Sequence, residues 1–188
     1  MNQRNPKMLL IVLALLITLA SSVFLISCKS KTETPSNQIS SFSGLVNPNS
    51  TLETVKVYEY IKSISGSKIL AGQQESTWMG SPDYEMNYLL EKTGKLPAIR
   101  GLDYINRDFR GVNNRSIKWW KEGGLVSICW HWGTPPNGVG YESSKGKIDM
   151  TEALTRGSPL YEGMMKQMDE VAQYLLKLQE AGVPVLWR

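Results

Sequence analysis

The sequence lacks the residue patterns that define several large classes of protein. It has only two cysteines in 188 residues, which is too few for the disulfide framework of a small secreted domain, and they lack the paired spacing of zinc ligands. The formal net charge is +4, and the basic residues are scattered, whereas a nucleic-acid binder usually gathers them in a stripe. Neither a Gly-x-Gly-x-x-Gly motif nor a P-loop follows any predicted strand, so both common signatures of nucleotide binding are absent.

The overall composition is that of a folding polypeptide. Hydrophobic residues make up 41% of the sequence and charged residues 20%, which excludes a wholly disordered tail, a collagen-like repeat and an acidic solvating segment. The length suits about one domain. It falls short of the roughly 250 residues of a complete (β/α)₈ barrel.

The first 27 residues have the pattern of an export signal. Arg4 and Lys7 precede an uncharged apolar run over residues 8–26, as in the n-region and h-region of a signal peptide. The run ends in Leu-Ile-Ser27-Cys28, which resembles a bacterial lipobox. Residues 1–27 are therefore predicted to be a lipoprotein signal peptide, and Cys28 the lipidated first residue of the mature chain. The alternative is an uncleaved transmembrane helix, since the run is about long enough to span a bilayer.

Residues 28–44 are predicted to be a flexible tether. They are rich in Ser, Thr, Lys and Asn, include Pro35 and show no helical or strand periodicity. The prediction places the protein in the bacterial cell envelope, anchored to the membrane through Cys28, with residues 45–188 facing the periplasm or the cell exterior.

From residue 50 onward, predicted helices and strands alternate. Apolar spacing and breaker residues favour helices near residues 50–65, 82–93, 116–122 and 158–181, and strands near 68–73, 96–102, 125–131 and 183–188. A long polar connection, residues 133–158, joins the third strand to the last helix, and no helix or strand is predicted within it. This alternation predicts an α/β fold with a parallel sheet. It fits either the first four βα units of a (β/α)₈ TIM barrel or a small doubly wound sheet.

In a barrel, functional side chains gather at the carboxyl ends of the strands. In this sequence the predicted strands end at residues 73–75, 103–104 and 131–132, and the fourth strand ends at Arg188. His131 and Trp132 follow the third strand, and Trp78 follows the first. Flat aromatic faces combined with hydrogen-bonding groups are typical of a carbohydrate site. Packing in the core remains an alternative for each tryptophan, and a structural role for the histidine.

Four strand-end motifs together resemble glycoside hydrolase family 26, the β-mannanases. They are Gly-Gln-Gln at 72–74, Pro-Ala-Ile-Arg-Gly-Leu-Asp-Tyr at 97–104, Gly-Gly-Leu-Val-Ser-Ile-Cys-Trp-His-Trp at 123–132 and Val-Pro-Val-Leu-Trp-Arg at 183–188. The resemblance implies a (β/α)₈ barrel that cleaves β-1,4-mannan internally with retention of configuration. It implies no metal and no cofactor.

The resemblance also implies where the chemistry lies. Retaining glycosidases use two carboxyl groups about 5–5.5 Å apart. In the family, the acid/base glutamate lies in an Arg-Pro-x-His-Glu stretch beyond the fourth strand, and the nucleophile glutamate lies at the end of the seventh. Neither has a match in these 188 residues. We therefore expect the N-terminal half of a lipid-anchored mannanase, inactive by itself, with no catalytic residue in this chain.

The resemblance assigns substrate-binding residues of the family to four positions of this chain. The resemblance implies that His131 lies beside the sugar ring, that Trp132 and Trp78 line the cleft, and that Arg188 helps to order the site. Nothing matches Glu75, Asp103 or Asp108 to a catalytic role, and they are expected to be polar ligands or to structure loops. The alternative functions are a non-catalytic glycan-binding lipoprotein and a misfolded or degraded product without activity.

Overall fold

The structure is a computed structural model that describes residues 44–47 and 49–188. The predicted signal peptide, Cys28 and nearly all of the predicted tether lie outside the described residues. Within the described ranges, no helix combines the length and the apolar character needed to cross a membrane.

Four parallel strands form one sheet in the order of the chain. They are β1 (Gly72–Gln74), β2 (Ile99–Asp103), β3 (Leu125–Cys129) and β4 (Val185–Trp187). Each strand pairs in parallel with the next, for example Gly101 with Ser127 and Ser127 with Leu186. A barrel places successive strands side by side, whereas a doubly wound sheet reverses its order at a switch point. The sequential order confirms the predicted partial (β/α)₈ barrel.

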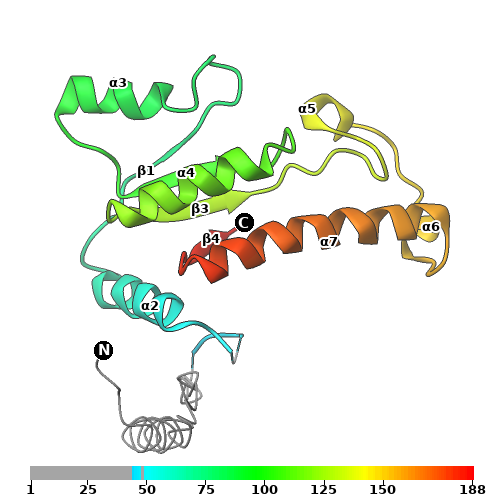
Figure 1. Ribbon diagram of the computed structural model, residues 1–188, viewed down its shortest axis with the longest axis horizontal. Coiled ribbons are helices and arrows are strands. Elements are labelled where there is room, and N and C mark those ends of the chain that lie inside the picture. Colours follow the sequence, from blue (N-terminus) through cyan, green and yellow to red (C-terminus); the bar gives the residue numbers. More distant parts are fainter. Residues whose placement is uncertain (1–43, 48) are drawn as a thin grey trace, which may run out of the picture. The chain divides into compact units, whose positions relative to one another are not determined.

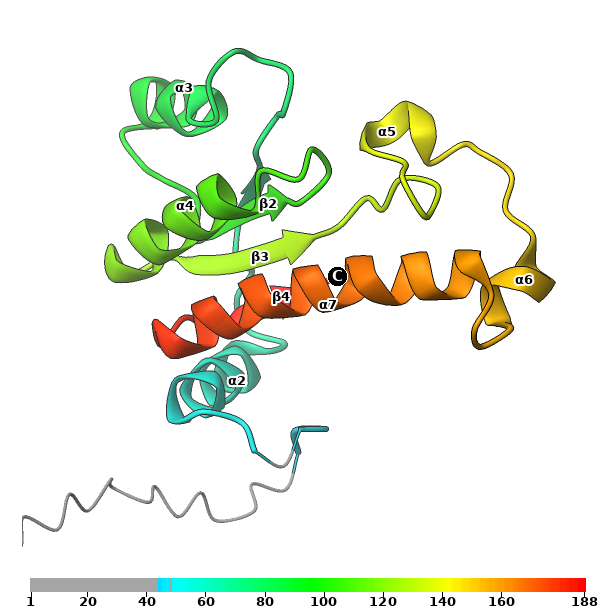
Figure 2. The same ribbon diagram turned by 45° about the vertical axis from the view of Figure 1, so that its right-hand side comes forward.

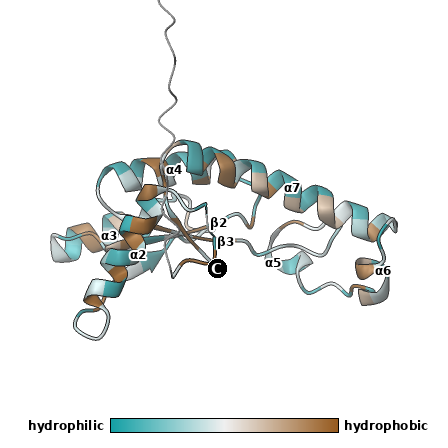
Figure 3. Cartoon of the chain, turned by 90° about the horizontal axis from the view of Figure 1, so that it is seen from below, coloured by the Kyte–Doolittle hydropathy of each residue, from teal (hydrophilic) through white to brown (hydrophobic). Residues whose placement is uncertain are grey.

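Helix α2 precedes β1, and the other helices lie between the strands in the sequence. Helix α4 packs against β2 and β3, and α7 runs beside α4 (Figures 1 and 2). From below, α4 and α7 are seen on the same face of the sheet (Figure 3). The helical bounds are α2 Leu52–Ile64, α3 Tyr84–Thr93, α4 Phe109–Lys121, α5 Gly140–Ser143, α6 Met150–Leu154 and α7 Pro159–Glu180.

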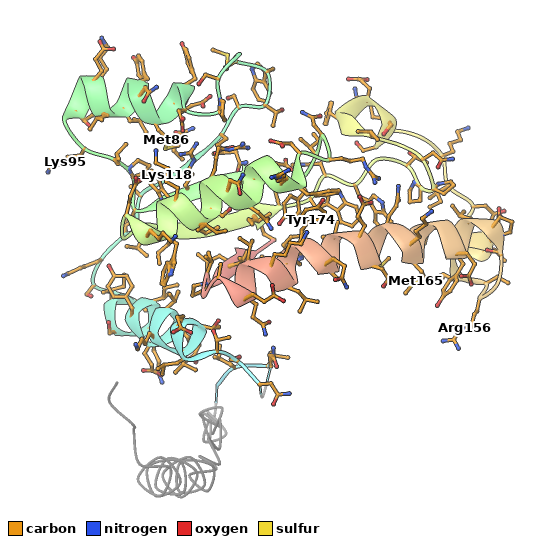
Figure 4. All side chains as sticks on the ribbon, in the orientation of Figure 1. Met86, Lys95, Lys118, Arg156, Met165 and Tyr174 are labelled. Carbon is orange, nitrogen blue, oxygen red and sulfur yellow. The ribbon has the colours of Figure 1, made fainter. Side chains whose placement is uncertain are left out.

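The core is the apolar space between the sheet and α3, α4 and α7. All five residues of β3 are buried, as expected for a parallel strand covered on both faces. Tyr174 of α7 points toward α4 (Figure 4) and stacks on Phe109 with ring centroids 4.9 Å apart. The buried apolar cluster comprises Met86, Leu102, Tyr104, Phe109, Val112, Trp119, Val126, Ile128, Val171, Leu178 and Val183.

Two elements differ in extent from the prediction. Strand β1 begins at Gly72, and Ile69, predicted to lie within it, is 95% exposed. The neighbouring segment before Ile99 contains Pro97, which has no N–H to donate to a longer ladder. Helix α4 begins at Phe109, two turns before the predicted start at residue 116, because Asp108 caps it by accepting from the Gly111 N–H at 3.0 Å.

The polar connection over residues 133–158 contains regular structure, contrary to the expectation of a structureless connection. It contains α5 and α6, and it is fastened to α7 through Gln167. The Gln167 side chain donates to the Pro136 carbonyl at 2.7 Å and accepts from the Trp132 indole N–H at 2.5 Å. These bonds fix the long connection above the carboxyl end of β3.

Candidate functional site

A cavity of about 580 Å³ opens at the carboxyl ends of β1, β2 and β3. Three of the four residues predicted to bind substrate, Trp78, His131 and Arg188, line it together. Its other walls come from the end of β1 and the following loop, from the end of β2 and from α5, with Gln73, Gln74, Glu75, Ser76, Thr77, Asp103, Ile105 and Tyr141. The cavity therefore lies at the edge of the sheet where a barrel keeps its functional groups.

His131 is held on the cavity wall by Asp103. One Asp103 oxygen accepts from the backbone N–H groups of Ile105 at 3.0 Å and His131 at 3.2 Å, and the other is hydrogen-bonded to His131 Nδ1. The Asp103 side chain is 8% exposed and that of His131 is 55% exposed. Because an ionised carboxylate can only accept, the shared proton resides on Nδ1. That arrangement leaves Nε2 of the exposed ring for a hydroxyl of a ligand.

Arg188 is positioned by hydrogen bonds to β1 and β3. Its guanidinium donates to the side-chain carbonyl of Gln74, and its backbone N–H donates to Ile128 O at 3.1 Å. Gly101 makes this contact possible, because a Cβ at that position would lie 2.3 Å from Gln74 Oε1. The glycine of the Arg-Gly-Leu-Asp segment thus leaves room for Gln74 to reach Arg188.

Trp78 and Trp132 occupy different surroundings. Trp78 is 79% exposed on the rim of the cavity. Trp132 lies outside that cavity: it stacks on Trp130 with centroids 4.7 Å apart, and it lines a separate hollow of about 200 Å³. Successive residues of an extended chain point to opposite sides, so Cys129 and His131 share one side while Trp130 and Trp132 take the other. The role of Trp132 in a cleft stays a prediction.

Glu75 belongs to a buried network of charges. Its carboxylate lies 2.6 Å from the Arg100 guanidinium and 3.1 Å from Arg115 Nε. Arg100 also donates to Asp83 Oδ1 at 2.7 Å, and Arg115 to Asp108 Oδ2 at 3.2 Å. These bonds join β1, β2, α4 and the loop after β1. Glu75 and Asp108 thus structure loops, as the sequence suggested, and Glu75 is fully engaged by two arginines.

Cys129 lies beneath His131, with its sulfur 3.9 Å from His131 Nδ1 and 3.5 Å from the Leu102 carbonyl. Burial, reinforced by the nearby Asp103 carboxylate, raises the pKa of the thiol to about 11. The thiol therefore stays protonated at neutral pH, which is unlike a catalytic cysteine.

Two features of the cavity were not predicted. The Asp103–His131 contact follows from the pairing of Asp103 with Cys129, and this register is not readable from one sequence. Tyr141 lines the cavity from α5. This short helix was not predicted because its segment is rich in Gly, Pro, Asn and Ser, which are typical of loops.

Known proteins resemble this chain in both sequence and structure. The glycosyl hydrolase family 26 model matches residues 46–188. A mannan endo-1,4-β-mannosidase of Thermothelomyces thermophilus is 33% identical over 172 residues, which are 82% of this chain and 34% of the relative. A family 26 structure from Muricauda sp. is 35% identical with a TM-score of 0.67, covering 76% of this chain and 49% of that one.

A ruminal family 26 endo-β-1,4-mannanase structure is 27% identical with a TM-score of 0.68, covering 80% of this chain and 35% of that one. The chain thus spans about a third of the curated relative and a third to a half of these two solved structures. The family match extends over nearly all of the described residues, including all four strands and the cavity. The chain belongs to glycosyl hydrolase family 26.

Proposed function

We propose that this chain supplies the substrate-binding half of an endo-1,4-β-mannanase that degrades mannan-type polysaccharide at the cell surface. The observation that carries the proposal is the joint placement of Trp78, His131 and Arg188 around one cavity at the strand ends of a family 26 fold. Support for mannan comes from the relatives, several of which are named as mannan endo-1,4-β-mannosidases.

The lining of the cavity suits a sugar. The exposed indole of Trp78 offers a flat apolar face for the C–H side of a pyranose, and the His131 ring can hydrogen-bond a hydroxyl. Arg188, held by Gln74, adds a fixed donor to the lining of the same cavity. A β-linked hexose has both kinds of surface, apolar on its faces and polar at its edge, so these groups recognise it in one orientation.

The 188-residue chain should bind manno-oligosaccharides but should not hydrolyse mannan. Of the carboxylates on the cavity wall, Glu75 is engaged by two arginines and Asp103 by His131. Both carboxylates are thus committed to cationic or imidazole partners, and the resemblance places the two catalytic glutamates that retention requires outside these residues. Reducing-end release from galactomannan by the purified chain should equal that of a protein-free control. Clear turnover would show that the chemistry lies within this chain.

Trp78→Ala should weaken the binding of mannohexaose while leaving stability unchanged. The indole is exposed at the rim, so its removal deletes a stacking surface without opening a hole in the core. Aromatic stacking contributes about 0.5–1.5 kcal/mol, so the Kd measured by calorimetry should rise about 2- to 12-fold. Tyr88→Ala is the matched control, because Tyr88 is also exposed but lies on α3 and does not line the cavity. Equal effects of the two substitutions would remove Trp78 from the site.

We also propose that Cys28 is acylated and holds the protein at the membrane of the bacterial envelope. The support is the lipobox-like Leu-Ile-Ser-Cys sequence and the polar run behind it. One acyl chain gives only weak, reversible membrane binding, whereas two chains give stable anchoring. Cys28→Ala should therefore abolish labelling by radioactive palmitate and leave residues 1–27 attached. Intact-mass analysis of membrane-extracted protein showing an unmodified Cys28 would contradict the anchor.

A further inference from the structure

Asp103, Cys129 and His131 place three potential metal ligands at one point of the sheet edge. Their ligand atoms lie within 4.8 Å of one another. Asp103 and Cys129 are paired neighbours in the parallel register of β2 and β3, so their side chains share a face. His131 follows two residues after Cys129 and returns to that same face. The cluster is therefore a product of strand register, and two of its members, Asp103 and His131, line the cavity.

We propose that Asp103, Cys129 and His131 form a binding site for a divalent cation of the zinc type. A thiolate, an imidazole nitrogen and a carboxylate oxygen are the ligands that zinc uses in proteins, and three protein ligands leave a fourth tetrahedral position open. Binding would release the Cys129 thiol proton to solvent. The imidazole proton would move from Nδ1 to Nε2, so that Nδ1 donates its lone pair to the ion. No electrons are transferred.

The geometry requires only a small adjustment. Zinc ligands lie about 2.0–2.3 Å from the ion, so His131 must withdraw slightly from Asp103 to admit it. The His131 side chain is 55% exposed and follows the end of β3, so it is free to make that movement. Asp103 and Cys129 are buried and fixed by bonds to backbone groups. The open fourth position then faces the cavity.

The ion would act as an inhibitor and not as a cofactor. It would replace the hydrogen bond that positions His131, and it would occupy the cavity wall beside Arg188, where the sugar is proposed to bind. This inhibitory consequence rests on the proposed function. The binding itself does not, and a metal titration without substrate tests it separately.

The metal titration is simple to interpret because the chain has few other imidazole and thiol groups. His131 is the single histidine of the chain, so a preparation without a histidine tag has no competing imidazole. In a Cys28→Ser background, Cys129 is also the single thiol. Addition of Co²⁺ should produce a thiolate-to-cobalt charge-transfer band that saturates near one equivalent, and Zn²⁺ should then displace the cobalt.

Cys129→Ser, Asp103→Asn and His131→Gln should each weaken Zn²⁺ binding by at least about 10–100-fold, the range lost even when outer-shell partners of a metal are removed. Glu142→Gln is the matched control, since this carboxylate is 82% exposed and pairs with Lys145 away from the cluster. It should leave the affinity unchanged.

A second measurement needs no site variant. The single imidazole gives one pair of ring ¹⁵N resonances, and Zn²⁺ should shift the Nδ1 resonance and convert the ring to the Nε2–H tautomer. Unchanged ring resonances at saturating Zn²⁺ would overturn the proposal. So would cobalt binding without a charge-transfer band, or equal affinities of the parent chain and His131→Gln.

Discussion

Replacing His131 with alanine should lower kcat/KM on mannan by about 10²–10³-fold, the loss measured when one preorganised hydrogen-bond donor to a transition state is removed. The measurement requires a complete active site. We therefore specify a fused enzyme, in which residue 188 continues into the C-terminal half of the ruminal family 26 mannanase, joined at the corresponding point after β4. His131 is expected to contribute because Asp103 fixes its ring in one orientation and leaves Nε2 at the cavity.

The melting temperature separates this role from a structural one. The His131 ring is 55% exposed, so its removal should barely change the stability of the fused enzyme. If His131 served the fold instead, the alanine variant would melt earlier while its folded fraction kept a near-normal kcat/KM. A near-normal kcat/KM at unchanged stability would remove His131 from the site altogether.

Replacing Arg100 with methionine should lower the free energy of unfolding by about 3 kcal/mol. Removing one partner of a buried ion pair costs about 3–5 kcal/mol, because the other charge is left in the interior without compensation. The side chains of Arg100 and Glu75 are 6% and 4% exposed, so this pair is buried. We expect the lower end of the range, because Arg115 still contacts Glu75 after the substitution.

Urea-induced unfolding of the 188-residue chain measures this loss. Arg110→Met on the same helix as Arg115 is the matched control, since Arg110 is exposed and such surface changes usually stay within about 0.5 kcal/mol. Methionine at position 100 retains the apolar part of the stem beside the Trp119 ring, which the guanidinium faces at 5.4 Å. A loss below about 1 kcal/mol would show that the network behaves as a solvent-screened surface cluster.

The sequence predicted the sheet because its signals are local and strong. The apolar run of β3 and the Pro at the start of α7 define their elements without help from distant residues. The alternation of strands and helices then implies the parallel order. The strand-end rule for barrels predicted that Trp78, His131 and Arg188 share one edge of the sheet, and all three line the cavity at that edge; their role in substrate binding stays a prediction.

Most of the structural features that the sequence did not predict depend on contacts between segments that are distant in the sequence. The first two turns of α4 contain Gly111 and Asn113, which are poor helix formers. They are helical because the Asp108 cap and the bonds of Asn113 to Tyr104 and the Tyr174 carbonyl stabilise them. Likewise, the indole N–H of Trp132, on the other side of the extended chain from His131, donates to Gln167 on α7. The Asp108 cap is local to α4, but no pattern within a single segment indicates that Asn113 meets Tyr174 or that Trp132 meets Gln167.

The measurement that tests the central claim most directly is reducing-end release from β-1,4-mannan by the fused enzyme, with His131→Ala and Tyr88→Ala measured alongside. A cooperative melt first establishes that each protein is folded. Our account predicts steady hydrolysis by the fused enzyme, the same rate in Tyr88→Ala and a rate about 10²–10³-fold lower in His131→Ala. A folded fused enzyme that leaves mannan intact, or one that hydrolyses it equally well without His131, would contradict the claim that this chain carries the substrate-binding half of a mannanase.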